Sequence, residues 1–436
     1  MSTCQIKNKY SWINCNLPSL EQDNEGLCLL HSQNINKNQD AFRELIERKF
    51  EAKDYDFQGG FSPCKVELNH QTISNNLNFE WATFLEPLSI IRTIFISYVN
   101  FYAVTFYKNV YFWGVTFYER ADFGGATFKG EAQFPGTTFY GIANFTGTTF
   151  ERNVTFYAST FKREAFFDKS NFNDEGDLCS IMVESETKIT FQDLSLSKVL
   201  LAETDVRKIV FHHVDWHHLR RFSWLPCRPA VYDEVKLNKE GLSFWDRLSC
   251  CIPIVGYALE IEKDINAMLI EQSSLFQIEK AIQNDFAKAE ELYRYLKLNY
   301  EEKGDLKQSG DFHYGEMEMY RKSHLGRRSF SWISFYWLLS GYGERPSWAL
   351  GWLGVFIAGM AGLVWGLGLK VGNPSDLAGF GDSFIYLLQK ATLQRPDWAD
   401  PVGFGGKIVA GFSVLLIPGQ AALFLLALRN RLGRRR

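Results

Sequence analysis

Residues 117–150 read FYERADFGGATFKGEAQFPGTTFYGIANFTGTTF, and in this stretch a phenylalanine returns after five and six residues by turns. The large apolar residues form two interleaved series, each with a period of 11, and the register holds without a slip from Leu68 to Phe172. The first series is Ile73, Phe84, Phe95, Phe106, Phe117, Phe128, Phe139, Phe150, Phe161 and Phe172. The second series is Leu68, Phe79, Ile90, Phe101, Phe112, Phe123, Phe134, Phe145, Phe156 and Phe167. Neither the helix period of 3.6 nor the strand period of 2 produces this spacing.

A small or β-branched residue stands two positions before most of these side chains, as at Ala121, Ala132 and Thr148. A repeated coil explains the pairing, because each short face sends one large and one small side chain inward and the next coil stacks the same residues on top. Phenylalanine on phenylalanine then forms an aromatic ladder. The alternative is an ordinary β-sandwich with a chance periodicity.

This stretch resembles the pentapeptide-repeat superfamily, in which a large residue and a small one two positions earlier point into a right-handed quadrilateral β-helix. The five-then-six spacing departs from the uniform fives of that family. The resemblance implies a mainly β solenoid over residues 66–213, with four faces, about 22 residues per coil and a rise of about 4.8 Å. We expect about six coils. The ladder continues more weakly through Leu178, Val183, Ile189, Leu194, Leu200 and Phe211.

The composition limits the class of protein. A chain of 436 residues is too long for one compact core, so two or three domains are expected. The net charge is −3, and Leu68–Phe172 holds eight acidic and eight basic residues, so neither an acidic DNA-mimic surface nor a nucleic-acid partner is expected. The sequence has no phosphate-binding glycine loop, nucleophile elbow or His-Glu-x-x-His motif, which indicates that the protein is not an enzyme.

Residues 1–65 form a polar leader with the spacing C-x10-C-x12-C-x2-H. The residues of this pattern are Cys4, Cys15, Cys28 and His31. Three thiolates and an imidazole suit a structural zinc ion, which would help so short and polar a segment to fold. The alternative is a partly ordered tail with unligated cysteines.

The eight cysteines do not have disulfide-like spacings, and residues 1–10 are polar. A reducing, cytosolic location follows for the N-terminal part. After His31 a helix is expected, with Ala41, Phe42, Ile46 and Phe50 on one face. It would cover the open end of the solenoid.

Two further segments precede the membrane portion. Residues 214–260 are predicted to form an irregular connector. Two histidines lie just before it and two lie near its start: His212, His213, His217 and His218. Because no cysteine or glutamate lies at ligand spacing beside them, a polar end of the solenoid explains them better than a metal site. Residues 261–328 predict a cytosolic helical hairpin, in which a helix ends at Gly304-Asp305 and a second runs from Leu306 to Lys322.

Residues 329–436 predict a membrane domain. Trp348–Leu369 and Ile408–Leu428 carry no charge and are each long enough to cross a hydrocarbon core of about 30 Å. Basic residues precede the first span and follow the second. By the positive-inside rule both termini are therefore expected on the cytoplasmic side, and the protein is expected in an inner (plasma) membrane. Residues 331–339 read as an interfacial helix. The alternative is a pair of buried core helices in a soluble domain.

The segment of residues 380–396 between the spans contains a short apolar run that is too short to cross, which is typical of a re-entrant pore helix. Span, short helix, polar stretch and span together resemble the two-span ion-channel superfamily. That resemblance makes Ser383, Thr392, Gln394, Arg395 and Asp397 candidates for the pore helix and filter. The potassium-channel filter Thr-Val-Gly-Tyr-Gly is replaced here by Leu-Gln-Arg-Pro-Asp-Trp, so potassium selectivity is not supported.

Pro418 interrupts the second span and would act as a hinge, and Gln420 is its one strongly polar residue. Gln420 could line a water-filled path. It could equally hydrogen-bond across a helix interface.

Two functions remain. In the first, residues 329–436 are a pore-forming unit that must assemble into a homo-oligomer such as a tetramer. The cytosolic solenoid and an unidentified protein or small-molecule activator would control this pore. Alternatively, residues 329–436 only anchor a scaffold whose solenoid faces bind a protein partner.

Overall fold

A computed structural model of the chain describes residues 3–433, apart from residues 12, 14, 22, 185–186, 220–227, 241–271, 325–331, 372–378, 393 and 395. The chain divides into two units. The first comprises Met1–Glu240 together with Glu291–Asn299, and the second comprises Gly241–Glu290 together with Tyr300–Arg436.

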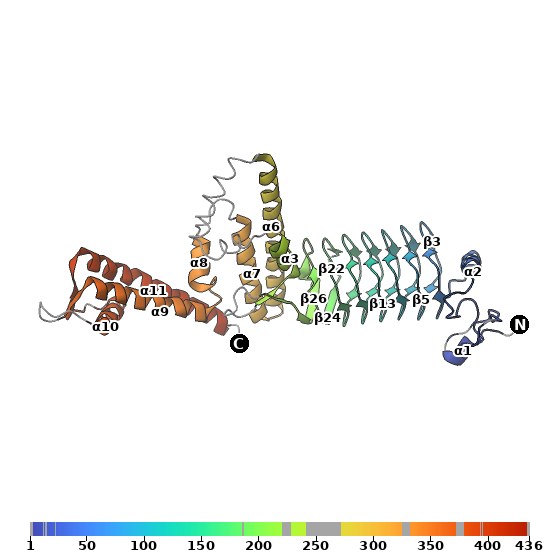
Figure 1. Cartoon of the computed structure of the whole chain (residues 1–436), viewed down its shortest axis with the longest axis horizontal. Helices are drawn as coiled ribbons and strands as arrows, with labels where there is room; N and C mark the ends of the chain where they lie inside the picture. The colour runs from blue at the N-terminus through green and yellow to red at the C-terminus, as the bar shows by residue number, and fades with distance from the viewer. Residues whose placement is uncertain are drawn as a thin grey trace. The chain divides into compact units, whose positions relative to one another are not determined.

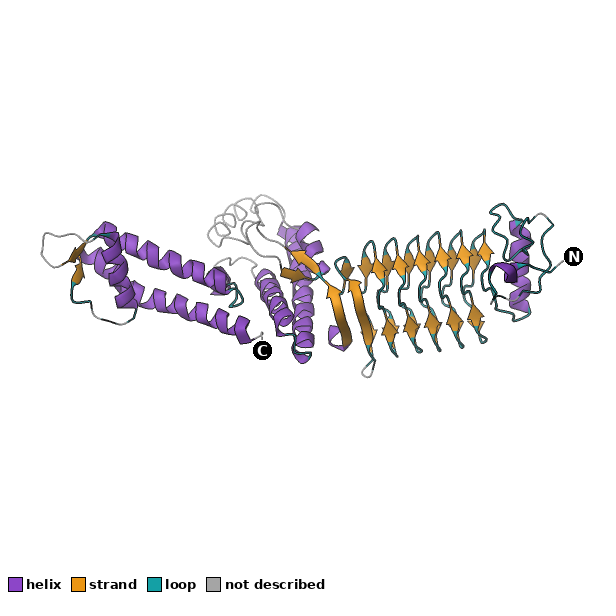
Figure 2. Ribbon diagram, turned by 90° about the horizontal axis from the view of Figure 1, so that it is seen from below, coloured by secondary structure: helices purple, strands orange, loops and turns teal. Residues whose placement is uncertain are grey.

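Four parallel sheets build a β-solenoid in the first unit (Figures 1 and 2). One sheet contains β1 (Phe61–Ser62), β5 (Thr83–Phe84), β9 (Thr105–Phe106), β13 (Thr127–Phe128), β17 (Thr149–Phe150) and β21 (Asn171–Phe172). The second contains β2 (Val66–Glu67), β6 (Leu88–Ser89), β10 (Val110–Tyr111), β14 (Ala132–Gln133), β18 (Val154–Thr155), β22 (Gly176–Asp177) and β25 (Val199–Leu200). The third contains β3 (Thr72–Ile73), β7 (Ile94–Phe95), β11 (Thr116–Phe117), β15 (Thr138–Phe139), β19 (Thr160–Phe161) and β23 (Met182–Val183). The fourth contains β4 (Leu77–Asn78), β8 (Val99–Asn100), β12 (Ala121–Asp122), β16 (Ala143–Asn144), β20 (Ala165–Phe166), β24 (Ile189–Ser195) and β26 (Ile209–Asp215).

The predicted solenoid is therefore confirmed, with four faces; its right-handedness stays a prediction. The two longest sheets have seven strands, so the solenoid has about seven turns instead of the expected six. The difference arises after Phe172, where the large-residue pattern weakens but β24 and β26 still pair in parallel.

From β1 to β23 the register of the sheets pairs residues that lie 22 positions apart, as in the pairing of Phe117 with Phe139. The last coils pair at separations of 20–24 residues. Phe123 illustrates the resulting core. Its ring stacks on those of Phe101 and Phe145 at centroid distances of 5.0 and 4.9 Å, and it meets Phe112 and Phe134 edge to face at 5.5 Å. Both arrangements suit the charge distribution of an aromatic ring, so the ladder adds to the free energy gained by burial alone.

Hydroxyl side chains at the small inward positions are also satisfied. The hydroxyls of Thr137, Thr148 and Ser159 are buried and donate to backbone carbonyls of the preceding coil at 2.6–2.8 Å. Because a buried hydroxyl without a partner would cost free energy, these bonds explain how threonine and serine substitute for alanine inside the coil.

Two short helices and a loop precede the first coil. These are α1 (Ile6–Lys9) and α2 (Gln39–Glu51), and the Asn38 side chain caps α2 by accepting from Asp40 N and Ala41 N. The Phe50 ring lies 5.6 Å from that of Phe57, which stacks on Phe79 of the first ladder at 5.1 Å. The α2 helix therefore covers the edge of the first coil.

Polar side chains cover the other end of the solenoid. The elements there are η1 (Val206–Lys208), β27 (His217–Leu219), β28 (Arg228–Ala230) and α3 (Tyr232–Glu240). The carboxylate of Asp233 accepts from the backbone N–H groups of Leu201 and Ala202. The amide of Asn299 donates to the carbonyls of Val206 and Ile209. Backbone groups that a further coil would have bound are thus paired.

The second unit is helical. It contains α7 (Leu306–His324), α8 (Trp332–Ser340), α9 (Pro346–Leu367), α10 (Phe380–Ala391) and α11 (Gly403–Gly433), with β29 (Leu369–Val371) paired to β30 (Ala399–Pro401). The helix α6 (Gln272–Glu302) contributes residues to both units. The expected helix start near residue 261 lies outside the described residues.

Candidate functional site

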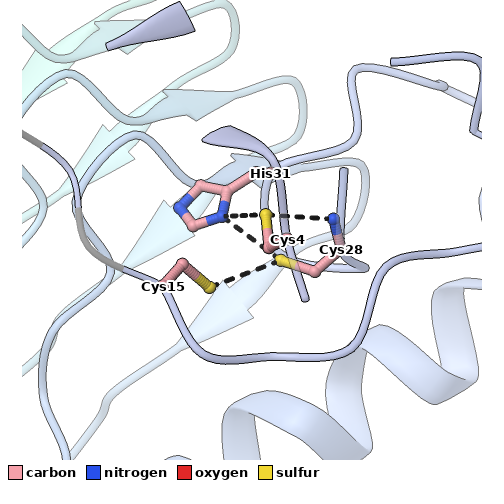
Figure 3. Close-up of side chains that lie close together, drawn as sticks. All are labelled: Cys4, Cys15, Cys28 and His31. Carbon is pink, nitrogen blue, oxygen red and sulfur yellow. Dashed lines mark hydrogen bonds between the residues drawn. The ribbon is translucent and has the colours of Figure 1, made fainter. Parts of the chain in front are cut away.

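The four predicted ligands of the leader come together in space (Figure 3). One ligand atom from each of Cys4, Cys15, Cys28 and His31 lies within 4.8 Å of all the others. Among the described residues, this is the group of cysteines, histidines and carboxylates whose positions could hold a metal ion. The three sulfurs belong to free thiols.

The interatomic distances match the edges of a metal-centred tetrahedron. Zinc bonds of about 2.3 Å to sulfur and about 2.05 Å to nitrogen imply edges of about 3.8 Å between two sulfurs and about 3.6 Å between sulfur and nitrogen. The Cys15 and Cys28 sulfurs lie 3.7 Å apart, and the His31 Nδ1 atom lies 3.5 and 3.2 Å from the sulfurs of Cys4 and Cys28. These three distances are close to the edges of such a tetrahedron, so the four side chains could hold a metal ion.

The histidine is oriented by a group outside the shell. Its Nε2 atom lies 2.9 Å from the carbonyl oxygen of Gln58, to which it donates. With the proton on Nε2, the Nδ1 lone pair of His31 points at the sulfurs, which is the tautomer that a metal needs.

A buried lysine lies next to the site. The Lys37 ammonium donates to the carbonyls of Leu29 at 2.7 Å and Ser32 at 2.9 Å. These hydrogen bonds fix the backbone on both sides of His31. Burial lowers the pKa of Lys37 to about 7. A hydrogen bond from the Cys28 thiol lowers the pKa of Cys15 to about 4, whereas burial raises that of Cys4.

Short antiparallel bridges explain how cysteines so far apart in the sequence meet. Thr3 bridges to Pro18, and Ser19 bridges to Cys28. Cys28 and His31 share one turn, in which His31 N donates to Cys28 O. The histidines near the other end of the solenoid do not join them: His213 and His218 contact the separate carboxylates Asp193 and Asp215.

The second candidate site lies in residues 329–436, the segment that the sequence predicts to be a membrane domain. Helices α9 and α11 are long and apolar enough to cross a membrane, by length and composition. Only 11% and 22% of their most apolar windows is buried in the described structure, whereas the core helix of a soluble domain would be mostly buried. The two helices pack along each other (Figure 1).

The α10 helix packs against one end of both spans. Tyr386 and Leu387 are buried in an apolar cluster with Ala361 and Val364 of α9 and Ala410 of α11. With 12 residues, α10 is about 18 Å long and cannot cross a membrane. The cluster that holds α10 extends along α9 to Ala361, which lies about 9 Å from the end of that helix.

The predicted filter residues occupy the loop side of this cluster. Thr392, Gln394 and Asp397 are exposed, and Ser383 is buried with its hydroxyl donating to Gly379 O. Arg395 lies outside the described residues. The segment ends in β30, which pairs with β29, and the Trp398 indole donates to the Gln389 amide oxygen at 2.7 Å. The sequence did not indicate this small hairpin, because its strands have only three residues each.

Gln420 is used inside the protomer. Its amide is 2% exposed and donates to the carbonyls of Leu339 at 2.8 Å and Ala349 at 2.9 Å. This is the geometry of a hydrogen bond across a helix interface, the second of the two alternatives. Pro418 lies inside α11, as the sequence requires.

We expect Gln420→Leu to lower the free energy of unfolding of the detergent-solubilised protein by about 1–2 kcal/mol, because two buried carbonyls lose a donor. Thermal unfolding monitored by circular dichroism measures the effect. Leu415→Ala on the same helix, where the side chain is 73% exposed, is the matched control and should change stability by less than about 0.5 kcal/mol. Equal effects of the two changes would contradict the prediction.

The solenoid wall carries a hollow of about 560 Å³. Its lining includes Tyr118, Tyr140, Lys162 and Arg163, which come from three successive coils, and the two tyrosine rings stack at 4.9 Å. Lys162 pairs with Glu184. Tyr118 and Tyr140 lie 22 residues apart, one coil of the solenoid, but this spacing alone names no ligand.

Comparison with known proteins identifies one part of the chain. No curated protein and no solved structure matches it. Residues 90–138 and 134–178 match the sequence model of the family described as pentapeptide repeats (9 copies). These residues build the middle coils described above. Residues 90–178 of the solenoid are therefore similar to pentapeptide repeats.

Proposed function

We propose that the protein is a membrane protein in which the pentapeptide-repeat solenoid controls an oligomeric, ion-channel-like pore. The observation that carries this proposal is the position of α10, a short helix packed against the loop-side end of both candidate spans. A segment between two spans that enters only part of the membrane is tolerated where protein or a water-filled path surrounds it. Two spans cannot enclose a path, so several copies must assemble.

A membrane-anchored scaffold is the alternative, in which the solenoid binds a protein partner. Its spans would need no ordered structure between them. The burial of Tyr386 and Leu387 and the pairing of β29 with β30 give that connection a defined structure, which favours the pore. Gln420 no longer contributes to the choice, because its amide is bonded within one protomer.

The proposed topology places both termini in the cytoplasm of a plasma membrane. Arg345 begins α9, and Arg429 and Arg431 lie near the end of α11, so basic residues gather at the end of the hairpin away from α10. The positive-inside rule makes that end cytoplasmic. An activator, protein or small molecule, would bind the cytosolic part, and nucleic acid is not an expected partner.

We also propose that the leader holds one zinc ion, with Cys4, Cys15, Cys28 and His31 as its ligands. A closed shell of three thiolates and one imidazole suits zinc among the common protein metals. The ion would stabilise the fold of the leader and would supply no catalysis, since no coordination position is open.

We expect liposomes that contain the purified protein to show ion flux, and Asp397→Asn to change it. An oligomer would repeat this exposed carboxylate around the path, so its removal should lower the ratio of cation to anion permeability about twofold or more. Flux under defined salt gradients and voltages gives the ratio.

Glu302→Gln, an equally conservative change at the exposed end of α6, is the matched control and should leave the ratio unchanged. Flux that is indifferent to Asp397→Asn would remove the loop from the path. A protein that assembles correctly but conducts nothing at any voltage, with or without cytosolic extract, would favour the scaffold.

A further inference from the structure

The turn between α8 and α9 has an unusual backbone. Gly341, Tyr342 and Gly343 all have positive φ, at 57°, 59° and 73°. Glycine adopts this region freely, but a bulky aromatic residue does so only when its surroundings require it. At Gly343 a Cβ would lie 2.5 Å from the Tyr336 hydroxyl, so a side chain there would collide. The turn is therefore held in one strained shape.

Contacts from α7 hold the strained residue. Tyr342 is 1% exposed, and its hydroxyl donates to the Glu318 carboxylate at 3.1 Å. Its ring meets that of Tyr314 edge to face at 5.3 Å. Arg321 binds the other Glu318 oxygen at 2.8 Å and fixes the acceptor. Buried groups of one cytosolic helix thus determine the conformation of the residue that leads into the first span.

Helix α8 and the start of α9 also contact α7. The indole of Trp337 in α8 donates to the Tyr314 hydroxyl at 2.8 Å, and the Arg321 guanidinium lies 5.4 Å from the centre of that indole. The Arg345 guanidinium, at the start of α9, lies 4.6 Å from the ring of Tyr314. Tyr314, Glu318, Trp337 and Tyr342 form a cluster that we name the α7 latch.

Both candidate spans contact the turn between α8 and α9 or the residues that flank it. The Asn430 side chain of α11 donates to the carbonyl of Gly343 at 3.1 Å, so α11 is hydrogen-bonded directly to the turn. Gln420, also on α11, donates to Leu339 at the end of α8 and to Ala349 in the first turn of α9. A change in the turn would therefore be felt by α9 and α11 together.

We propose that the α7 latch is the coupling element through which the cytosolic part changes the arrangement of the two spans. The inference rests on the proposed function, because it names how that pore would be regulated. When Tyr342 leaves Glu318, the strained turn loses the contacts that impose its positive φ and relaxes. Relaxation at a short connection between two helices changes the direction of the helix that follows, which is hinge motion. Binding on the cytosolic side would act by moving α7 relative to the turn.

The test uses Tyr342→Phe and Glu318→Gln in the full-length protein in lipid nanodiscs. Tyr342→Phe removes the hydrogen bond to Glu318, and Glu318→Gln weakens it by replacing the charged acceptor with a neutral amide oxygen. Both changes keep the size of the side chain. We expect hydrogen–deuterium exchange of the amides from Gly341 to Ala349 to become about tenfold faster, while exchange in the solenoid stays unchanged. We expect ion flux through liposomes to change about threefold or more in either direction.

Tyr320→Phe on the same helix is the matched control. Among the described residues no hydrogen bond of the Tyr320 hydroxyl is seen, so both readouts should stay at the wild-type values. Trp337→Phe, which removes the bond to Tyr314, is a second variant in case a change at Glu318 prevents folding.

The outcomes separate the two proposals. Unchanged exchange at the turn in all three latch variants would overturn the latch. Where the wild-type protein conducts ions, faster exchange with unaltered flux would overturn it too. If the wild-type protein conducts nothing, the pore is wrong, whereas faster exchange confined to the turn and the first turn of α9 would still support the latch.

Discussion

Metal analysis of the purified chain is expected to give about one zinc ion per polypeptide, and Cys28→Ser is expected to lower this to near zero. Cys28 is fully buried at the centre of the cluster, where it contacts Cys15 and His31. Structural zinc sites contribute about 10–16 kcal/mol to folding, so the leader should unfold in the variant. Mass spectrometry of the metal content and limited proteolysis of residues 3–37 measure both effects.

Cys64→Ser is the matched control. Cys64 is as buried as the proposed ligands but lies outside the cluster. The Cys64→Ser protein should keep its zinc and its resistance to protease. A Cys28→Ser protein with the wild-type zinc content would show that the ion binds elsewhere. A wild-type protein without metal whose leader resists protease would show that the leader folds without an ion.

Phe123→Ala is expected to destabilise the solenoid by about 3–5 kcal/mol. The ring is fully buried and contacts six other phenylalanines, two by stacking, three edge to face and one at a tilt. Close-packed coils above and below prevent the cavity from collapsing, which places the cost toward the upper end of that range. Denaturant titration of the full-length protein, followed by hydrogen exchange at the amides of β12 and β13, gives the free energy of unfolding.

Tyr140→Ala is the control for the aromatic stacking itself. Tyr140 stacks on Tyr118 as closely as the inner rings stack, but its side chain is 42% exposed. We expect a loss below about 1 kcal/mol, since little apolar area returns to water. Similar losses in the two variants would mean that ring stacking, and not burial in the core, dominates the stability of the ladder.

The solenoid could be predicted from the sequence because its physics is periodic. Each inward position recurs after 11 residues, and a parallel register carries that period directly into stacked side chains. The number of turns was less predictable, because after Phe172 the backbone pairing continues while the large side chains vary. Handedness leaves no mark on the spacing and stays a prediction.

The candidate sites show where sequence spacing stops being informative. Cys28 and His31 could be paired from one turn, but the approach of Cys4 and Cys15 depends on bridges between irregular segments. Gln420 stands out in the sequence as the one strongly polar residue of its span, but spacing does not distinguish a water-filled path from a helix interface. The bond from Tyr342 to Glu318 left no pattern at all, since it joins two helices through a strained turn.

The most direct test of an assembled pore is to count the subunits of the wild-type protein in lipid nanodiscs by native mass spectrometry. The count needs no activator and no knowledge of the ion. We expect one closed oligomer, with four copies as the resemblance to two-span channels implies, and no monomer at low protein concentration. A protein that stays monomeric in lipid, with α9 and α11 alone in the bilayer, would contradict the pore and leave the anchored scaffold.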